Sequence, residues 1–125
     1  MKNIIYLLLI LLISGTANAG ERLTGDEHKD FYSDKTIVGV HFKSGPQKSY
    51  YSSDGTVQSQ SDNDTKRTGK WWINKKNKRC IKWDHKPKKK CHYTEKNSDG
   101  THTLIHGKKG KKLVEIGETL DGNQL

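Results

Sequence analysis

Apolar and polar residues alternate along most of the chain in short runs that are separated by turn residues. Alternation with a period of two is typical of strands with one buried face. The first run, 36–42, is rich in β-branched and aromatic residues and ends before Gly45 and Pro46. We expect 62–68 to be a loop and 117–125 to be irregular, because both are polar. The eight predicted strands are 36–42, 47–52, 56–61, 69–74, 79–84, 90–95, 101–106 and 111–116.

The order of these runs indicates an all-β fold. No connection between them is long enough for a parallel crossover, so the pattern favours an antiparallel meander of about eight strands. Such a meander closes into a small lipocalin-like barrel or, alternatively, folds as a sandwich. One short helix is predicted before the strands, from Gly25 to about Tyr32, with Thr24 as its N-cap and Glu27 completing a capping box.

Alternation also indicates which side chains form the core. Each strand is expected to bury one of its two faces. Trp71 and Trp72 are adjacent and point to opposite faces, so we expect one in the core and the other partly exposed. The other candidate core residues are Val38, Val40, Phe42, Ile73, Ile81, Trp83, Val114 and Ile116.

The first nineteen residues have the pattern of a secretory signal. Lys2 is followed by an unbroken apolar run at 4–13 and by Ala-Asn-Ala at 17–19, the small-x-small pattern that signal peptidase reads. Ten apolar residues are too few to span a bilayer, which needs roughly 20. We therefore expect a cleaved signal at 1–19 and a single β-rich domain at 20–125, located in the periplasm or secreted.

The chain has two cysteines, Cys80 and Cys91, and export would take both to an oxidising compartment. A bridge between them would close a loop of about a dozen residues and stabilise the fold by on the order of 3 kcal/mol. A metal or redox site is the alternative, but the spacing is far from C-x-x-C. We predict a structural disulfide.

Charge is distributed unevenly along a chain whose formal net charge is +9. Residues 66–112 hold 17 Lys and Arg against 3 Asp and Glu, whereas the segments on either side are mildly acidic. A basic block of this kind suits an anionic partner.

Basic loops interleaved with aromatic rings can hold a polyanion, the amines pairing with its charges and the rings packing against it. In an exported protein, lipopolysaccharide or an acidic glycan is a better fit than a dedicated nucleic acid, and a protein partner is a further possibility. The alternative is a solvated lysine surface that aids solubility and protects edge strands. The candidate anion-binding residues are Lys75, Lys76, Lys78, Arg79, Lys82, Lys86, Lys88, Lys89 and Lys90, with a possible extension to Lys108–Lys112. The candidate aromatic residues are Trp72, Trp83 and Tyr93.

No motif indicates catalysis, a cofactor or a metal. The chain contains neither G-x-S-x-G nor H-E-x-x-H, so we expect a protein that is not an enzyme. The histidine spacings match no metal template, so we expect scattered surface histidines at 28, 41, 85, 92, 102 and 106. A second functional hypothesis is a lipocalin-style carrier of a small apolar ligand in a barrel interior lined by Trp71, Ile81 and Trp83.

A series of short motifs resembles a family of small exported bacterial proteins of unknown function that are lipocalin-like in appearance. In order, the motifs are T-[IV]-V-G at 36–39, Y-Y-S-x-D-G-T at 50–56, G-x-W at 69–71, C-[IL]-x-W at 80–83, C-x-Y at 91–93 and G-[ND] at 122–123. The resemblance covers most of residues 23–123 and implies an exported β-barrel-like domain with a disulfide. It implies no reaction, and the Lys-rich stretch 75–90 departs from its pattern.

Overall fold

The computed structural model describes residues 20–62 and 65–125, so the predicted signal at 1–19 lies outside the described residues. Within them the chain forms one short helix and nine strands of a single sheet. The elements are β1 (Glu21–Arg22), α1 (Gly25–Tyr32), β2 (Lys35–His41), β3 (Gly45–Tyr51), β4 (Thr56–Ser61), β5 (Lys66–Ile73), β6 (Arg79–Trp83), β7 (Lys90–Lys96), β8 (His102–His106) and β9 (Lys112–Asp121).

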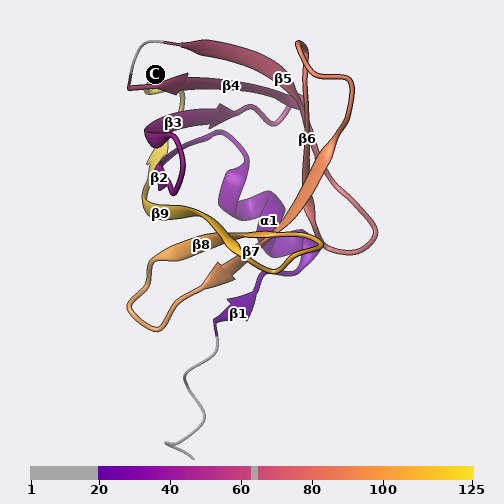
Figure 1. The fold of residues 1–125 in the computed structure, drawn as a ribbon, viewed down its shortest axis with the longest axis vertical. Coiled ribbons are helices and arrows are strands. Elements are labelled where there is room, and N and C mark those ends of the chain that lie inside the picture. The colour runs from indigo at the N-terminus through magenta and orange to yellow at the C-terminus, as the bar shows by residue number, and fades with distance from the viewer. Residues whose placement is uncertain (1–19, 63–64) are drawn as a thin grey trace, which may run out of the picture.

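Eight strands, β2 to β9, form a closed antiparallel barrel (Figure 1). Each strand pairs with the next along the chain, and β9 returns to pair with β2, which closes the barrel. The predicted antiparallel meander is therefore confirmed, and its form is a barrel. The sequence patterns did not indicate β1, whose two residues pair with the end of β7.

The helix α1 begins and ends at the predicted residues, and its capping box is present. The Glu27 backbone N–H donates to Thr24 Oγ1 at 3.2 Å, and the Thr24 N–H donates to Glu27 Oε1 at 2.9 Å. These bonds satisfy backbone donors that have no partner within the helix. No helix in the described part of the chain is both long enough and apolar enough to cross a lipid bilayer.

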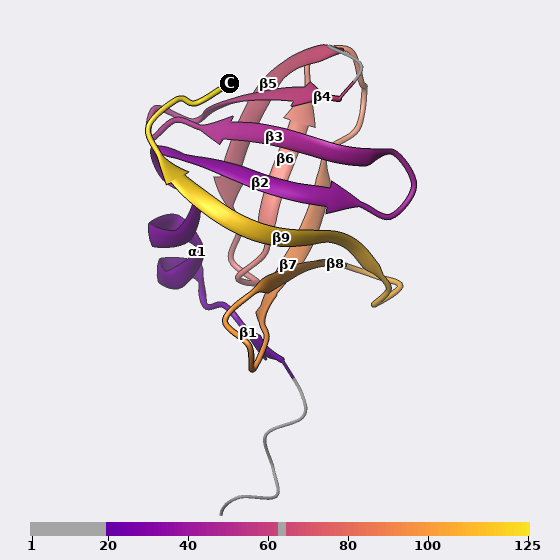
Figure 2. The same cartoon turned by 90° about the vertical axis from the view of Figure 1, so that its left-hand side faces the viewer.

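The helix closes one end of the barrel. Tyr32 is 1 % exposed, its hydroxyl lies 2.7 Å from Thr94 Oγ1, and its ring contacts those of Tyr51 and Trp71. We call the two ends of the barrel the helix end and the open end, and Figure 2 shows α1 on the left and the turns after β2 and β8 on the right. The helix end carries the connections 52–55, 74–78 and 97–101, and the open end carries 42–44, 84–89 and 107–111 together with Asp62 and Thr65, which follow β4 and precede β5.

The apolar core fills the half of the barrel that lies against α1. Trp71 is buried and Trp72 is 36 % exposed, which confirms that the two tryptophans face opposite ways. The predicted burial of Ile81, Val114 and Ile116 is also confirmed. The core cluster consists of Tyr32, Ile37, Tyr51, Val57, Trp71, Ile81, Leu104, Val114 and Ile116.

The predicted inner face of β2 is wrong. Val40 and Phe42 are 49 % and 59 % exposed, and Val38 lies with Val40 in a shallow hollow of about 760 Å³ on the outside of the barrel. Ile37 and His41 face the interior instead. Both faces of this strand carry apolar residues, and the interior beyond the core is polar, so hydrophobic alternation indicated the wrong face.

Two predicted boundaries are also wrong. Strand β5 begins at Lys66 rather than at residue 69, because Lys66 and Arg67 pair with Gln60 and Ser59 of β4. Strand β9 continues to Asp121, so most of the tail that was expected to be irregular belongs to the barrel wall. Both extensions are mostly polar and contain a single large apolar residue, Leu120, so hydrophobic alternation gave no signal for them.

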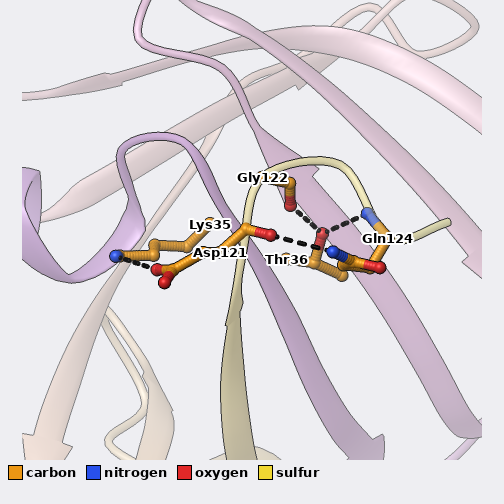
Figure 3. Close-up of polar contacts among 5 residues, drawn as sticks. All are labelled: Lys35, Thr36, Asp121, Gly122 and Gln124. Carbon is orange, nitrogen blue, oxygen red and sulfur yellow. Dashed lines mark hydrogen bonds and ion pairs between the residues drawn. The ribbon is translucent and has the colours of Figure 1, made fainter.

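The chain end beyond β9 is held against the start of β2 (Figure 3). The Thr36 hydroxyl donates to Gly122 O at 2.6 Å and accepts from the Gln124 N–H at 2.9 Å. Lys35 forms an ion pair with Asp121 beside them. These contacts lie at the seam where β9 meets β2.

The predicted disulfide between Cys80 and Cys91 is confirmed. The two residues are direct partners in the pairing of β6 with β7, which covers three residue pairs, fewer than any other pairing in the described barrel wall. The bridge therefore reinforces the shortest ladder of the barrel.

Candidate functional site

A cavity of about 200 Å³ lies inside the barrel toward the open end. None of the described residues that line it is Asp or Glu, whereas six are basic. Five strands contribute the six basic side chains, His41 (β2), Arg67 (β5), Arg79 (β6), Lys90 and His92 (β7) and His106 (β8). The meander makes this convergence possible, because inward positions of consecutive strands meet in one lumen.

Arg79 is the most deeply placed cation of this cavity and is only 6 % exposed. Its Nη1 donates to Tyr51 Oη at 2.6 Å, and its guanidinium carbon lies 5.5 Å and 5.7 Å from the ring centres of Tyr32 and Tyr51. Its Nε is buried and has no hydrogen-bond partner among the described residues.

Arg79 also has no counter-ion among the described residues. The ion pairs found among the described residues, Arg22 with Glu95 and Lys35 with Asp121, involve other side chains. A buried charge without a partner is costly, and a buried donor without an acceptor adds to that cost. The cavity therefore holds a positive charge that no described carboxylate compensates.

Three histidines add hydrogen-bond donors to the same cavity. The Gly107 N–H donates to His92 Nδ1 at 3.1 Å, and the Lys43 N–H donates to His41 Nδ1 at 3.0 Å. The N–H groups of Lys108 and Lys109 donate to His106 Nδ1 in the same way, at 3.1 Å and 3.0 Å. A ring nitrogen that accepts a hydrogen bond carries no hydrogen, so the neutral rings carry theirs on Nε2.

The surroundings keep these three histidines neutral. Burial, with the nearby Arg79 charge as the next cause, lowers the pKa of His92 to about 3. Burial also lowers the pKa of His41 and His106, and the neighbouring lysines Lys43 and Lys109 act in the same direction. The permanent positive charges of the cavity are therefore those of Arg67, Arg79 and Lys90.

The basic residues singled out in the sequence do not form one patch. Lys75, Lys76 and Lys78 lie in the connection at the helix end. Lys86, Lys88 and Lys89 lie in the β6–β7 connection at the open end, next to Lys90 at the start of β7. Arg79 faces the cavity, whereas Lys82 is exposed on β6 and its Nζ donates to Lys86 O at 3.0 Å.

The β8–β9 connection brings more lysines to the open end. Lys108, Lys109 and Lys111 lie in it, all exposed, and Lys112 begins β9. The predicted extension of the basic cluster over Lys108–Lys112 therefore lies at the same end as the loop 84–89. The helix-end lysines lie at the opposite end of the barrel.

The three aromatic candidates lie apart from one another. Trp72 is exposed on β5. Tyr93 has Arg22 over its ring at 3.9 Å and Lys78 at 4.9 Å, and it does not line the cavity. Trp83 lines the cavity, with the guanidinium of Arg67 over its ring at 4.4 Å.

The residues expected to line an apolar pocket are divided between two places. Ile81 and Trp83 line the cavity. Trp71 belongs to the core beneath α1, where its Nε1–H donates to Ser52 O at 2.7 Å. Polar side chains complete the lining of the cavity where Trp71 was expected, because Ser49 and Ser59 face this space.

Sequence reasoning missed Arg67, His41, His92 and His106 as cavity residues. Period-two spacing could have indicated two members of the site, because Arg79 lies two residues before Ile81 on the same face of β6, and Arg67 lies at the same phase as Trp71 on β5. The expectation of surface histidines is wrong for His28 and His92, which are 0 % and 7 % exposed.

Among residues 20–62 and 65–125, no group of three His, Cys, Asp or Glu side chains is arranged to hold a metal ion. Comparison of the chain with protein-family models, with curated proteins and with solved structures finds no match.

Proposed function

We propose that this protein is an exported binding domain, without enzymatic activity, that holds an anionic envelope component through the open end of its barrel. Lipopolysaccharide and acidic glycans are the candidate components, and an acidic protein partner is the other outcome that the test below covers. Cys80 and Cys91 form a disulfide, which suits an oxidising compartment outside the cytoplasm.

The observation that carries this proposal is the excess of lysines over carboxylates in the connections at the open end. Their described residues contain seven lysines and two aspartates, all of them exposed. The lysines are Lys43, Lys86, Lys88, Lys89, Lys108, Lys109 and Lys111, and the aspartates are Asp62 and Asp84. Residues that adjoin these loops, among them His41, Lys90 and His106, line the cationic cavity, which adds charge of the same sign. A ring of amines of this kind attracts a polyanion and releases its counterions on binding.

A carrier of an apolar ligand receives less support from the same geometry. The cavity of about 200 Å³ is smaller than the roughly 300–1,000 Å³ of typical small-molecule sites. Three permanent cations also line it, and an apolar ligand would remove water from them without pairing their charges.

Two pairs of adjacent exposed lysines allow a matched test. The variant Lys88→Gln/Lys89→Gln removes two charges from the open end, and Lys75→Gln/Lys76→Gln removes the same number from the helix end. Binding to lipopolysaccharide and to a sulfated glycan is measured by calorimetry at low and at high salt.

The open-end pair should weaken binding far more than the helix-end pair. Each lysine near an anionic surface contributes about 1 kcal/mol, so we expect roughly thirty-fold weaker binding for two. Binding by the wild-type protein should also weaken steeply with salt. Equal losses in the two variants, or binding that does not depend on salt, would overturn the proposal. Binding of acidic proteins alone would reassign the partner class.

The export step has its own measurement. We expect the protein recovered from a bacterial host to lie outside the cytoplasm and to begin at Gly20, as intact mass spectrometry would detect. A cytoplasmic protein that retains residues 1–19 would contradict this part of the proposal.

A further inference from the structure

We infer that the cavity at the open end is a binding site for a single compact oxyanion group, phosphate or sulfate, with Arg79 as the residue that the group contacts. The group is either a free ion or the terminal group of a larger molecule. This inference rests on the proposed function, because the anionic molecule bound by the open-end lysines would place its phosphate or sulfate group in the cavity.

The state of Arg79 is the first reason. This side chain lies in the cavity lining, is only 6 % exposed, and has a buried Nε–H without an acceptor among the described residues. Within the described part of the chain the Tyr51 hydroxyl accepts from its Nη1, and no described carboxylate pairs with it. A guanidinium offers five N–H donors in a planar fork that matches the oxygen atoms of phosphate and sulfate. An oxyanion in the cavity would supply the missing counter-charge.

The remainder of the lining is the second reason. The Nδ1 atoms of His41, His92 and His106 accept backbone N–H groups, so the Nε2–H groups are the free donors of these rings. Arg67 and Lys90 add two permanent charges. A lining that is rich in donors and has no carboxylate among its described residues favours a ligand that accepts hydrogen bonds, and its positive charge repels metal cations.

Size and charge select the class of ligand. The cavity of about 200 Å³ has room for a small group and not for a fatty acyl chain. Arg67, Arg79 and Lys90 together carry three positive charges, so a doubly charged group compensates them better than a single carboxylate does. The rest of a larger molecule would extend past Trp83 toward the loop lysines.

The test follows the wild-type protein by NMR while inorganic phosphate replaces chloride at constant ionic strength. We expect saturable shifts of the Arg79 side chain and the His92 ring, with a matching response to sulfate. A parallel titration with glucose 6-phosphate distinguishes the source: tighter binding than phosphate assigns the site to a terminal group, and weaker binding assigns it to the free ion. Shifts that fail to saturate, or that occur only at loop lysines, would overturn the inference.

Variants separate this inference from the proposed function. Arg79→Met and Arg79→Gln should each reduce phosphate affinity about tenfold or more, because a charged hydrogen-bonding partner is lost. Lys88→Gln/Lys89→Gln should keep phosphate affinity near the wild-type value while weakening glycan binding roughly thirty-fold. Unchanged phosphate affinity in both folded Arg79 variants would refute the cavity site and leave the loop surface intact. If the lysine variant weakens only glycan binding and the Arg79 variants weaken phosphate binding, the loops and the cavity are separate sites, as the inference requires.

Discussion

Arg79 and Tyr51 meet across the interior of the barrel, where Arg79 Nη1 donates to the Tyr51 hydroxyl at 2.6 Å. The two residues lie on β6 and β3, strands that are not neighbours in the sheet. Both are buried, at 6 % and 3 % exposed. This hydrogen bond therefore stabilises a charge that no carboxylate in the described part of the chain neutralises.

A double-mutant cycle on Arg79 and Tyr51 measures how much this hydrogen bond contributes to the free energy of unfolding. In buffer free of phosphate and sulfate, Tyr51→Phe should destabilise the protein by about 1–3 kcal/mol, because a buried charged donor loses its acceptor. Arg79→Met should be neutral or stabilising, because an unpaired buried charge is replaced by an apolar side chain that adapts to its surroundings. Urea unfolding at neutral pH gives the free energies.

The coupling between the two changes is the decisive quantity. Once Arg79 is replaced by Met, Tyr51→Phe should cost much less than it does in the wild-type protein. If the two effects simply add, the hydrogen bond contributes little, and the charge of Arg79 is compensated in some other way.

The contacts of Thr36 with the chain end support the closing seam of the barrel. Thr36→Val keeps the shape of this fully buried side chain but removes its bonds to Gly122 O and the Gln124 N–H. We expect a loss of about 1–3 kcal/mol and faster hydrogen exchange of the Gln124 amide. Thr119→Val is the matched control, because Thr119 is exposed on β9, and should change stability by about 0.5 kcal/mol or less. Equal effects of the two changes would contradict this role of Thr36.

The disulfide should affect both the free energy of unfolding and the local order of the β6–β7 pairing. Reduction should lower the free energy of unfolding by on the order of 3 kcal/mol, because the reduced unfolded chain gains conformational freedom. It should also loosen the three-pair ladder between β6 and β7, which positions Arg79 opposite His92. Urea unfolding with and without reductant measures the first effect, and hydrogen exchange of the β6 and β7 amides measures the second.

The variant Cys80→Ser/Cys91→Ser supplies the control, because its stability should not respond to reductant. Wild-type protein that unfolds at the same urea concentration in both conditions would show that the bridge does not contribute to stability.

Stability should fall as the solution becomes mildly acidic. Burial, with Arg79 as the next cause, lowers the pKa of His28 to about 4 and that of His92 to about 3, against 6.5 in the unfolded chain. Between these values the unfolded chain binds protons that the folded protein does not, so the stabilisation is complete above pH 6.5 and is lost on acidification.

Each of these two histidines should change the folding equilibrium by up to about tenfold per pH unit in that window. Urea unfolding between pH 7 and pH 5 tests this above the range where the carboxyl groups titrate. His28→Gln should reduce the slope by about one proton, and an unchanged slope would show that His28 does not titrate as described.

Local patterns were sufficient to predict most of the secondary structure. Thr24 and Glu27 specify the start of α1 through contacts within one helical turn, and the turn residues at Asp54-Gly55 separate two strands. The partnership of Cys80 and Cys91 could also be predicted, because the chain contains no other cysteine. Each of these inferences depends on residues close in sequence or unique in the chain.

The candidate site depends instead on distances that no local pattern encodes. Arg79 meets Tyr51, 28 residues earlier, and the seam at Thr36 closes against Gln124, 88 residues later. Hydrophobic alternation assumes that the inner face of a strand is apolar, and for β2 it selected Val38 and Val40, which lie outside. The sequence by itself determined the existence of the eight barrel strands, the helix and the bridge. Only the closed barrel decided which basic residues share the interior, because closure brings inward positions of five strands around one cavity.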